Sequence, residues 1–251
     1  MSEINRVKMD NENLIKNPNK LISYSDPHKI RELIQKKNFS SINELKLNIE
    51  ASEIKKINPI DNLISMGVLR TKIDAHPYQM NVALTVLKDM NVNAILADEV
   101  GLGKTIEAGM IIKELILRDR IKSVLIICPK ALLNQWKDEL REKFGENFEI
   151  ANDKSFQGFE FEDKVICSSG LVLHRNKQIT SRKWDLIIVD EAHLYRNTKS
   201  KGRADLLKIP KSHLLLLTAT PINNKLTDLF SLVDLVYPGL LETENSFKSR
   251  Y

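Results

Sequence analysis

Apolar runs alternate with amphipathic stretches through most of the chain. The mainly apolar runs, which predict buried strands, cover residues 93–97, 124–128, 164–168, 186–189 and 214–217. Apolar residues recur instead at three- and four-residue spacings, which predicts helices, after residues 76 and 104, from Ala131 to Phe144 and from Leu226 to Val236. Buried strands that alternate with helices indicate a parallel sheet covered on both faces. We therefore expect an α/β protein whose ligands bind beyond the carboxyl ends of the strands.

The beginning of the chain has a different pattern. Residues 1–22 are rich in Asn and Lys and show no clear period, so we expect a mobile arm there. Helix signals follow at Asp26-Pro27 and over residues 60–67, where Gly67 is expected to end a short helix. We therefore divide the chain into a small, partly mobile helical segment, residues 1–75, and a larger α/β domain, residues 76–251.

A glycine-bearing turn joins the first predicted strand to the helix that starts at Lys104. Its sequence is Asp98-Glu99-Val100-Gly101-Leu102-Gly103-Lys104-Thr105. Glycine adopts backbone angles that turn N–H groups around a polyphosphate, and the following helix N-terminus favours the same anion. Lys104 would contact the outer phosphates and Thr105 would bind Mg²⁺. The generic motif has Gly where this chain has Asp98, and a plain Gly-rich turn before a helix is the alternative.

A second polar cluster, Asp190-Glu191-Ala192-His193, follows the apolar run 186–189. Carboxylates at the end of an apolar strand are costly unless another charge offsets them. Mg²⁺ beside a nucleotide phosphate would do so, with Asp190 as its ligand. Glu191 would then polarise the attacking water as general base. A helix N-terminus, where acids are also favourable, is the alternative explanation.

Hydroxyl groups mark the end of the last predicted strand. Thr218 and Thr220 follow the apolar run 214–217. They are candidates for hydrogen bonds to His193 or Asp190, through which they would sense the state of the nucleotide. Thr-Ala-Thr-Pro is also a plain signal for a turn after a strand.

Composition and charge narrow the class of protein. The chain has 251 residues, of which 42% are hydrophobic, and a net charge of +5, which is compatible with nucleic-acid binding without proving it. No apolar run approaches 18 residues and the N-terminus lacks a secretion signal, so we expect no membrane contact. Cys128 and Cys167 lie in apolar runs without metal-ligand spacing, which favours buried thiols in a reducing, cytoplasmic compartment.

Taken together, the motifs resemble the first RecA-like lobe of the superfamily-two helicase-like ATPases. Within that group they are most similar to the Swi/Snf family of duplex translocases, especially its bacterial RNA-polymerase-recycling branch. Asp98 is the usual residue in that family, so the departure from the generic loop supports the resemblance. The matching segments occur in family order: His76-Pro77-Tyr78-Gln79, DEVGLGKTIEAG at 98–109, ICPKALLNQW at 127–136, Ser168-Ser169-Gly170 with His174-Arg175, DEAH at 190–193 and LTATPINN at 217–224.

The resemblance implies a three-layer P-loop NTPase fold that binds ATP and Mg²⁺ and moves on duplex DNA. It implies that Gln79 recognises adenine and that residues 98–105 hold the phosphates. The same resemblance suggests coupling residues and contacts to the nucleic-acid backbone: His193, Thr218 and Thr220 for coupling, and Lys130, Ser168, Ser169, Arg175 and Asn223 for the backbone. Trp136 could stack on a base, but its place in the middle of an apolar helix face favours core packing.

The family works with two such lobes and with ATP between them, and the second lobe supplies arginines to the phosphates. This chain ends at Tyr251 without a second set of motifs. We therefore expect a fragment or truncated product that binds ATP–Mg²⁺ weakly and hydrolyses it slowly. The expected partners are duplex DNA, a second lobe, and RNA polymerase or a defence complex. A strand-separating RNA or DNA helicase and a catalytically silent assembly module are the alternatives.

Overall fold

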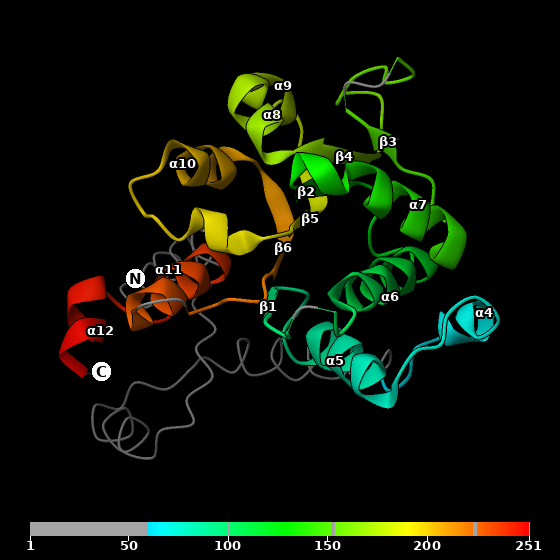
Figure 1. Ribbon diagram of the computed structural model, residues 1–251, viewed down its shortest axis with the longest axis horizontal. Coiled ribbons are helices and arrows are strands. Elements are labelled where there is room, and N and C mark those ends of the chain that lie inside the picture. Colours follow the sequence, from blue (N-terminus) through cyan, green and yellow to red (C-terminus); the bar gives the residue numbers. More distant parts are fainter. Residues whose placement is uncertain (1–59, 100, 152–153, 223–224, 251) are drawn as a thin grey trace, which may run out of the picture. The chain divides into compact units, whose positions relative to one another are not determined.

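The computed structural model describes residues 60–99, 101–151, 154–222 and 225–250, all within one compact unit, Pro59–Tyr251. The arm and helix expected before residue 60, and the predicted site residues Val100 and Asn223, lie outside the described residues. In chain order the elements are α4 (Met66–Leu69), α5 (Pro77–Lys88), β1 (Ala94–Leu96), α6 (Lys104–Leu117), β2 (Val124–Cys128), η2 (Lys130–Leu132), α7 (Leu133–Phe144), β3 (Glu149–Ile150), β4 (Lys164–Ser168), α8 (Ser169–His174), α9 (Asn176–Ile179), β5 (Trp184–Val189), η3 (Ala192–Tyr195), α10 (Lys201–Lys208), β6 (Lys211–Leu217), α11 (Leu226–Val236) and α12 (Glu244–Arg250) (Figure 1).

The strands form one six-stranded sheet in the order β1-β6-β5-β2-β4-β3, and every neighbouring pair is parallel. This confirms the α/β prediction and the five predicted strands. Two of these strands begin earlier than their apolar runs, β5 at Trp184 and β6 at Lys211. The two-residue strand β3 was not predicted.

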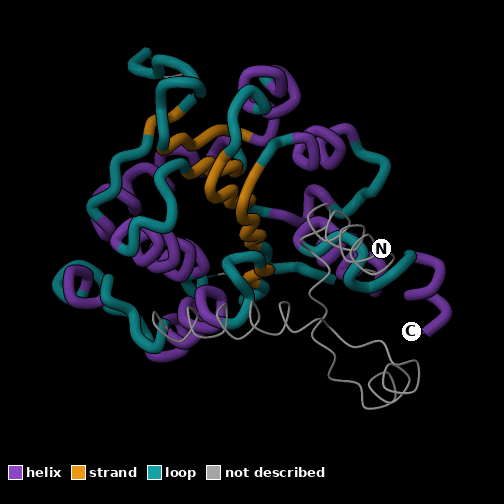
Figure 2. Tube along the Cα trace, turned by 180° about the vertical axis from the view of Figure 1, so that it is seen from behind, coloured by secondary structure: helices purple, strands orange, loops and turns teal. Residues whose placement is uncertain are grey.

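Every strand except the two-residue β3 sends alternate side chains into two separate cores. Ile126 and Ile188 pack on one face with α5, α6 and α7, whereas Leu125 and Ile187 pack on the other with α8, α9, α10 and α11. Figures 1 and 2 show the sheet between these two groups of helices. The continuous apolar runs therefore reflect burial of both faces, and the fold is the expected three-layer arrangement.

Helices α6 and α7 approach each other closely beside the sheet. A Cβ atom added to Gly109 of α6 would lie 2.3 Å from ring atoms of Phe144 at the end of α7. Gly145 follows the last residue of α7 and adopts the left-handed conformation with φ 67°, which is common for glycine at the C-terminus of a helix. This packing fixes the position of α7 relative to the start of α6, where the predicted phosphate loop lies.

The helix expected over residues 60–67 was predicted wrongly. Helix α4 begins only at Met66, and Gly67 lies within it. The buried carboxylate of Glu114 in α6 accepts hydrogen bonds from the backbone N–H groups of Ile64 at 3.1 Å and Ser65 at 2.8 Å. These donors are therefore used in a tertiary contact instead of an earlier helical turn. The predicted division of the chain at residue 76 stays a prediction.

The helix predicted from Ala131 begins instead as the short 3₁₀ segment η2 before α7. Helices α8, α9, α10 and α12 were not predicted. Among the described residues, no helix has the length and apolar character needed to cross a membrane.

Candidate nucleotide site

The order of the strands brings three predicted polar clusters to one edge of the sheet. Strand β6 lies between β1 and β5, and all three are parallel. The loop after β1, Thr218 after β6 and Asp190 after β5 therefore follow the carboxyl ends of adjacent strands. The N–H of Thr218 donates to Leu96 O at 3.0 Å, and the N–H of Asp190 donates to Ile127 O at 2.8 Å, so both residues are fixed to the sheet.

The loop after β1 is shaped by two glycines in the left-handed region. Gly101 has φ 86° and Gly103 has φ 89°, and Gly103 directly precedes the first residue of α6. Lys104 folds back over this loop, where its ammonium donates to Asp98 O at 2.6 Å and to Glu99 O at 2.8 Å. Thr105 follows in the first turn of α6 and is half-buried. Lys104 is thus held at the loop, and the roles of Lys104 at the phosphates and Thr105 at Mg²⁺ stay predictions.

Gln79 supports the loop from α5. Its Nε2 donates to Leu102 O at 3.0 Å, while its Oε1 accepts from the N–H of His76 at 2.9 Å. The hydroxyl of Tyr78 donates to the same Leu102 carbonyl at 2.7 Å. Gln79 is buried, so its carboxamide links the start of α5 to the loop. Sequence reasoning placed Gln79 at the nucleotide but missed this link, and its contact with adenine stays a prediction.

A buried carboxyl group lies beneath the same loop. Glu107 of α6 is fully buried, and neither carboxyl oxygen makes a hydrogen bond among the described residues. Burial, together with the nearby carboxylate of Asp98, raises the pKa of Glu107 to about 8. At neutral pH the group is therefore mostly protonated, which avoids an unpaired buried charge. Glu107 was not among the predicted site residues.

Both carboxylate oxygens of Asp190 accept hydrogen bonds from the protein. Oδ1 accepts from the N–H of Glu191 at 2.9 Å, and Oδ2 accepts from the indole Nε1–H of Trp136 at 2.9 Å. Trp136 is 2% exposed, which confirms core packing as its role. The hydrogen bond to Asp190 was missed, although a buried indole N–H needs an acceptor and none was assigned to it.

Glu191 has an uncommon backbone conformation. Its φ of 52° and ψ of 47° place it in the left-handed region, which a residue with a side chain adopts at a cost. Its Oε2 lies 2.9 Å from Nδ1 of His193, without the alignment of a hydrogen bond. The turn after β5 therefore brings together the predicted general base and the predicted coupling histidine.

The hydroxyl groups at the end of β6 bond locally. Thr218 is buried, and its Oγ1 accepts from the N–H of Thr220 at 3.2 Å. Among the described residues neither threonine makes the predicted hydrogen bond to His193 or Asp190. Their part in coupling stays a prediction.

Four of the residues predicted to contact nucleic acid lie at or after the ends of β2 and β4, which are neighbours in the sheet. Lys130 is exposed at the start of η2, and Arg175 is exposed after α8. Ser168 instead caps α8, accepting from the N–H of Leu171 at 3.3 Å, and the Ser169 hydroxyl is buried. The Ser169 hydroxyl is therefore buried and Ser168 is half-buried, whereas Lys130 and Arg175 are exposed and open to a polyanion.

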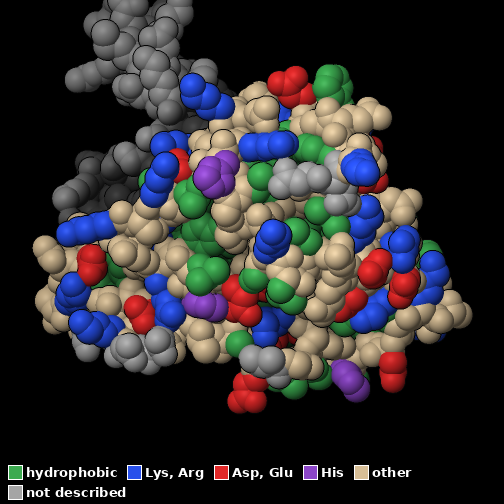
Figure 3. Space-filling view, turned by 45° about the horizontal axis from the view of Figure 1, so that its top comes forward, with side chains coloured by type: hydrophobic (Ala, Val, Ile, Leu, Met, Phe, Trp, Pro, Cys, Tyr) green, Lys and Arg blue, Asp and Glu red, His purple; other side chains and the backbone are tan. Residues whose placement is uncertain are grey.

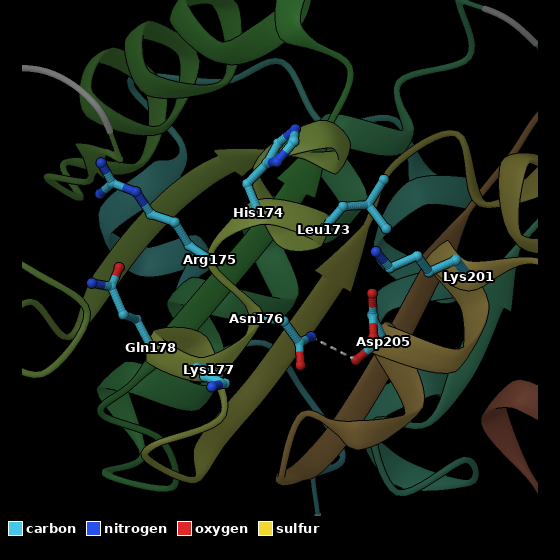
Figure 4. Close-up of a pocket in the computed structure, with 8 residues that line it drawn as sticks. All are labelled: Leu173, His174, Arg175, Asn176, Lys177, Gln178, Lys201 and Asp205. Atoms are coloured by element: carbon cyan, nitrogen blue, oxygen red, sulfur yellow. Dashed lines mark hydrogen bonds between the residues drawn. The ribbon is translucent and has the colours of Figure 1, made fainter.

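Arg175 borders an open hollow of about 710 Å³ between residues of α8, α9 and α10 (Figure 4). The lining residues are Leu173, His174, Arg175, Asn176, Lys177, Gln178, Lys201 and Asp205. Asp205 is paired with Lys208 at 3.0 Å, so the hollow has a positive balance. Figure 3 shows Lys and Arg side chains spread over the face drawn there and mixed with Asp and Glu side chains.

The donors at the sheet edge suit Mg²⁺ held in company with a nucleotide. Among the described residues, no three His, Cys, Asp or Glu side chains are grouped so that they could hold a metal by themselves. Mg²⁺ is usually held by one or two protein oxygens together with phosphate oxygens and water. Thr105 and Asp190 would each supply one oxygen. The loop is open to a ligand at Gly101, where an added methyl group would meet no atom within 4 Å.

The parallel sheet, the glycine loop before α6 and the acidic pair after β5 define a P-loop NTPase lobe of the helicase-like class. The family model described as the SNF2-related domain matches residues 78–251. The chain therefore belongs to the SNF2-related family, which confirms the resemblance carried by the motifs.

Relatives and solved structures agree with this assignment. The chain is 42% identical over 178 residues to the uncharacterized ATP-dependent helicase YqhH of Bacillus subtilis, a match covering 70% of this chain and 31% of YqhH. It is 37% identical over 188 residues to the RNA polymerase-associated protein RapA of Proteus mirabilis, covering 68% and 19%. The Sulfolobus solfataricus SWI2/SNF2 ATPase core in complex with double-stranded DNA matches with a TM-score of 0.65 and 28% identity, covering 72% of this chain and 39% of that one. The chain thus spans well under half the length of these relatives.

Proposed function

We propose that this chain is the ATP-binding lobe of a Swi/Snf-type translocase that hydrolyses ATP to ADP and phosphate. When a second lobe is present, hydrolysis is coupled to movement along duplex DNA. The observation that carries the proposal is that the Lys104 loop after β1 and the pair Asp190 and Glu191 after β5 lie at the same edge of the sheet, with β6 as the single strand between them. Membership of the SNF2-related family supports ATP as the nucleotide.

Each residue at the edge has a distinct part in this proposal. The amides around Gly101 and Gly103 surround the phosphates, and Lys104 exchanges the carbonyls of Asp98 and Glu99 for phosphate oxygens. Thr105 and Asp190 hold Mg²⁺, which when bound neutralises negative charge on the phosphates. Glu191 accepts a proton from the attacking water, and its contact with His193 orients the carboxylate.

The nucleic-acid partner follows from charge and from the structural neighbour. The Sulfolobus solfataricus core was solved with double-stranded DNA. Lys130 and Arg175, together with the hollow beside Arg175, offer exposed cations that suit contacts to phosphates, which carry no base sequence. The name of the RapA relatives also supports RNA polymerase as a partner of the whole protein.

A thermal-shift experiment tests the nucleotide site. ATP with Mg²⁺ should raise the melting temperature of the unaltered chain, because a ligand that binds only the folded state stabilises it. The shift should be lost in Lys104→Ala. Lys201→Ala is the matched control, since it removes an equal charge from the exposed hollow and should keep the shift. An equal shift in both variants would overturn the assignment of Lys104.

An ATPase assay separates the proposed function from its alternatives. The single lobe should turn over ATP very slowly, because arginines supplied in trans are worth about 10³–10⁵ in related phosphoryl transfers. Addition of the second lobe should restore turnover and make it more sensitive to duplex DNA than to single strands or RNA. Stronger stimulation by single strands would favour a strand-separating helicase. The absence of nucleotide binding would favour a silent assembly module.

A further inference from the structure

We infer that Trp136 is a positioning residue for the metal-binding carboxylate, and that its indole N–H sets the orientation of Asp190. The inference rests on the proposed function, because it takes Asp190 as the Mg²⁺ ligand. It assigns a second task to a side chain whose burial alone suggests only a place in the core.

The carboxylate is held from two sides by groups of different origin. The N–H of Glu191, the next residue, donates to Oδ1, and Trp136 donates to Oδ2 from α7, 54 positions away. With one donor on each oxygen, the plane of the carboxylate is fixed. Each carboxylate oxygen can accept a second interaction, so an oxygen stays available to a metal or its bound water. Outer partners of this kind orient metal ligands in many proteins.

Trp184 shows that burying an indole in this fold does not require a carboxylate. It is fully buried in the other core, and its Nε1 donates to the backbone carbonyl of Ile179 at 3.1 Å. Trp136 instead donates to a charged acceptor, and such hydrogen bonds are about twice as strong as neutral ones. Helix α7, which carries Trp136, packs against α6 through the close approach of Phe144 to Gly109, and this contact restricts the position of the helix that carries the donor.

Phenylalanine substitutions at the two tryptophans form a matched pair. Each removes one indole N–H from a buried site while keeping an aromatic ring. The measured quantity is the Mg²⁺ concentration that gives half-maximal binding of a fluorescent, non-hydrolysable ATP analogue. Trp136→Phe should raise it by about tenfold or more, in line with losses of about 10–100-fold at outer partners of metal ligands. Trp184→Phe should change it less than about twofold, and binding of the analogue in EDTA should be similar in both variants.

A spectroscopic measurement needs no substitution at Trp136. The chain has two tryptophans, so a ¹⁵N-labelled sample gives two indole N–H signals. The variant Trp184→Phe assigns them. Addition of Mg²⁺ to the complex with the analogue should move the Trp136 signal, because the ion withdraws charge from the acceptor of its hydrogen bond. The Trp184 signal should stay in place.

The outcomes separate the inference from the function on which it rests. Unchanged Mg²⁺ dependence in folded Trp136→Phe, or a Trp136 signal that does not move when Mg²⁺ binds, would overturn the inference and leave the proposed function standing. If Trp136→Phe does not fold, the response of the Trp136 indole signal to Mg²⁺ in the unaltered chain decides whether the inference holds. If the unaltered chain binds no analogue with Mg²⁺, the proposed function fails and the inference fails with it.

Discussion

Gly103 lies so close to Gln79 that a methyl group on its Cα would be 2.3 Å from the Gln79 Nε2 atom. Gln79 contacts the loop that contains Gly103, since its Nε2 donates to the carbonyl of the neighbouring residue Leu102. The glycine is therefore required twice, once by its φ of 89° and once by the buried carboxamide. Packing against α5, and not phosphate binding alone, restricts this position.

Gly103→Ala should lower the free energy of unfolding more than Gly101→Ala does. Gly101 has nearly the same φ, 86°, but a methyl group there would meet no atom within 4 Å. Gly101→Ala should therefore cost only the strain of a residue with a Cβ atom in the left-handed conformation, about 1–2 kcal/mol. Gly103→Ala should add an overpacking term of about 1–3 kcal/mol. Urea denaturation without nucleotide measures both.

The variant Gln79→Ala supplies the control for this pair. In its background the carboxamide is absent, so the cost of Gly103→Ala should fall to that of Gly101→Ala. Equal costs of Gly103→Ala with and without Gln79 would show that the close approach has no energetic weight.

The apolar pattern located the main strands because burial on both faces leaves continuous apolar runs. It could not locate β3, which has two residues, or the start of β6, where Lys211-Ser212-His213 is polar. Helix α10 was missed although Ser200 caps it, accepting from the N–H of Arg203, and the cap was the available signal. Local patterns thus define the sheet better than the short helices around it.

Local sequence context also pointed to the residues of the candidate site, but it did not reveal the contacts that support them. Lys104 and Asp190 stand beside a glycine turn and at a strand end, so neighbouring sequence reveals them. The bonds from Trp136 to Asp190 and from Gln79 to Leu102 join residues 54 and 23 positions apart. No periodicity records such pairs, because they arise only when α5 and α7 pack against the sheet.

The buried Glu107 should make stability depend on pH. Its pKa rises from an ordinary value of 4.5 to about 8 on folding, so between these values the folded state holds a proton that the unfolded state has lost. This contribution is fully present below about pH 4.5 and is lost as pH rises toward 8, by at most about 1.4 kcal/mol per pH unit. Glu107→Gln, which keeps the shape of the neutral acid, should lose this slope. Urea denaturation from pH 5.5 to 8 in EDTA tests it.

A second buried glutamate of α6 is the control for the pH experiment. Glu114 accepts hydrogen bonds from the N–H groups of Ile64 and Ser65 and pairs with Arg118 at 2.6 Å. Glu114→Gln removes a paired charge and should destabilise the chain without removing the slope. If the profiles of Glu107→Gln and the unaltered chain run parallel across this range, the raised pKa of Glu107 is refuted.

Gly109→Ala should destabilise the fold even though alanine favours helix. The substitution gains up to about 1 kcal/mol of helix propensity. The methyl group would overlap the ring of Phe144 at 2.3 Å, and overpacking of this kind costs about 1–3 kcal/mol. A net loss in thermal or urea denaturation is the expected result. Gly170→Ala in α8, where a methyl group meets nothing within 4 Å, should be neutral or stabilising, and a similar gain at Gly109 would contradict the close packing of α6 and α7.

Arg175, the exposed cation that borders the hollow on α8, α9 and α10, should contribute to duplex DNA binding through its charge alone. Each phosphate contact adds about 0.9 to the slope of log affinity against log salt, so Arg175→Ala should reduce that slope by about one. Arg141 on α7 is also exposed but is paired with Asp138 at 3.0 Å, which makes Arg141→Ala the control that should leave the slope unchanged. Fluorescence anisotropy between about 50 and 200 mM salt measures it. Equal slopes for Arg175→Ala and the unaltered chain would place the DNA path elsewhere, whereas a loss confined to some DNA sequences would indicate base contacts instead of phosphate contacts.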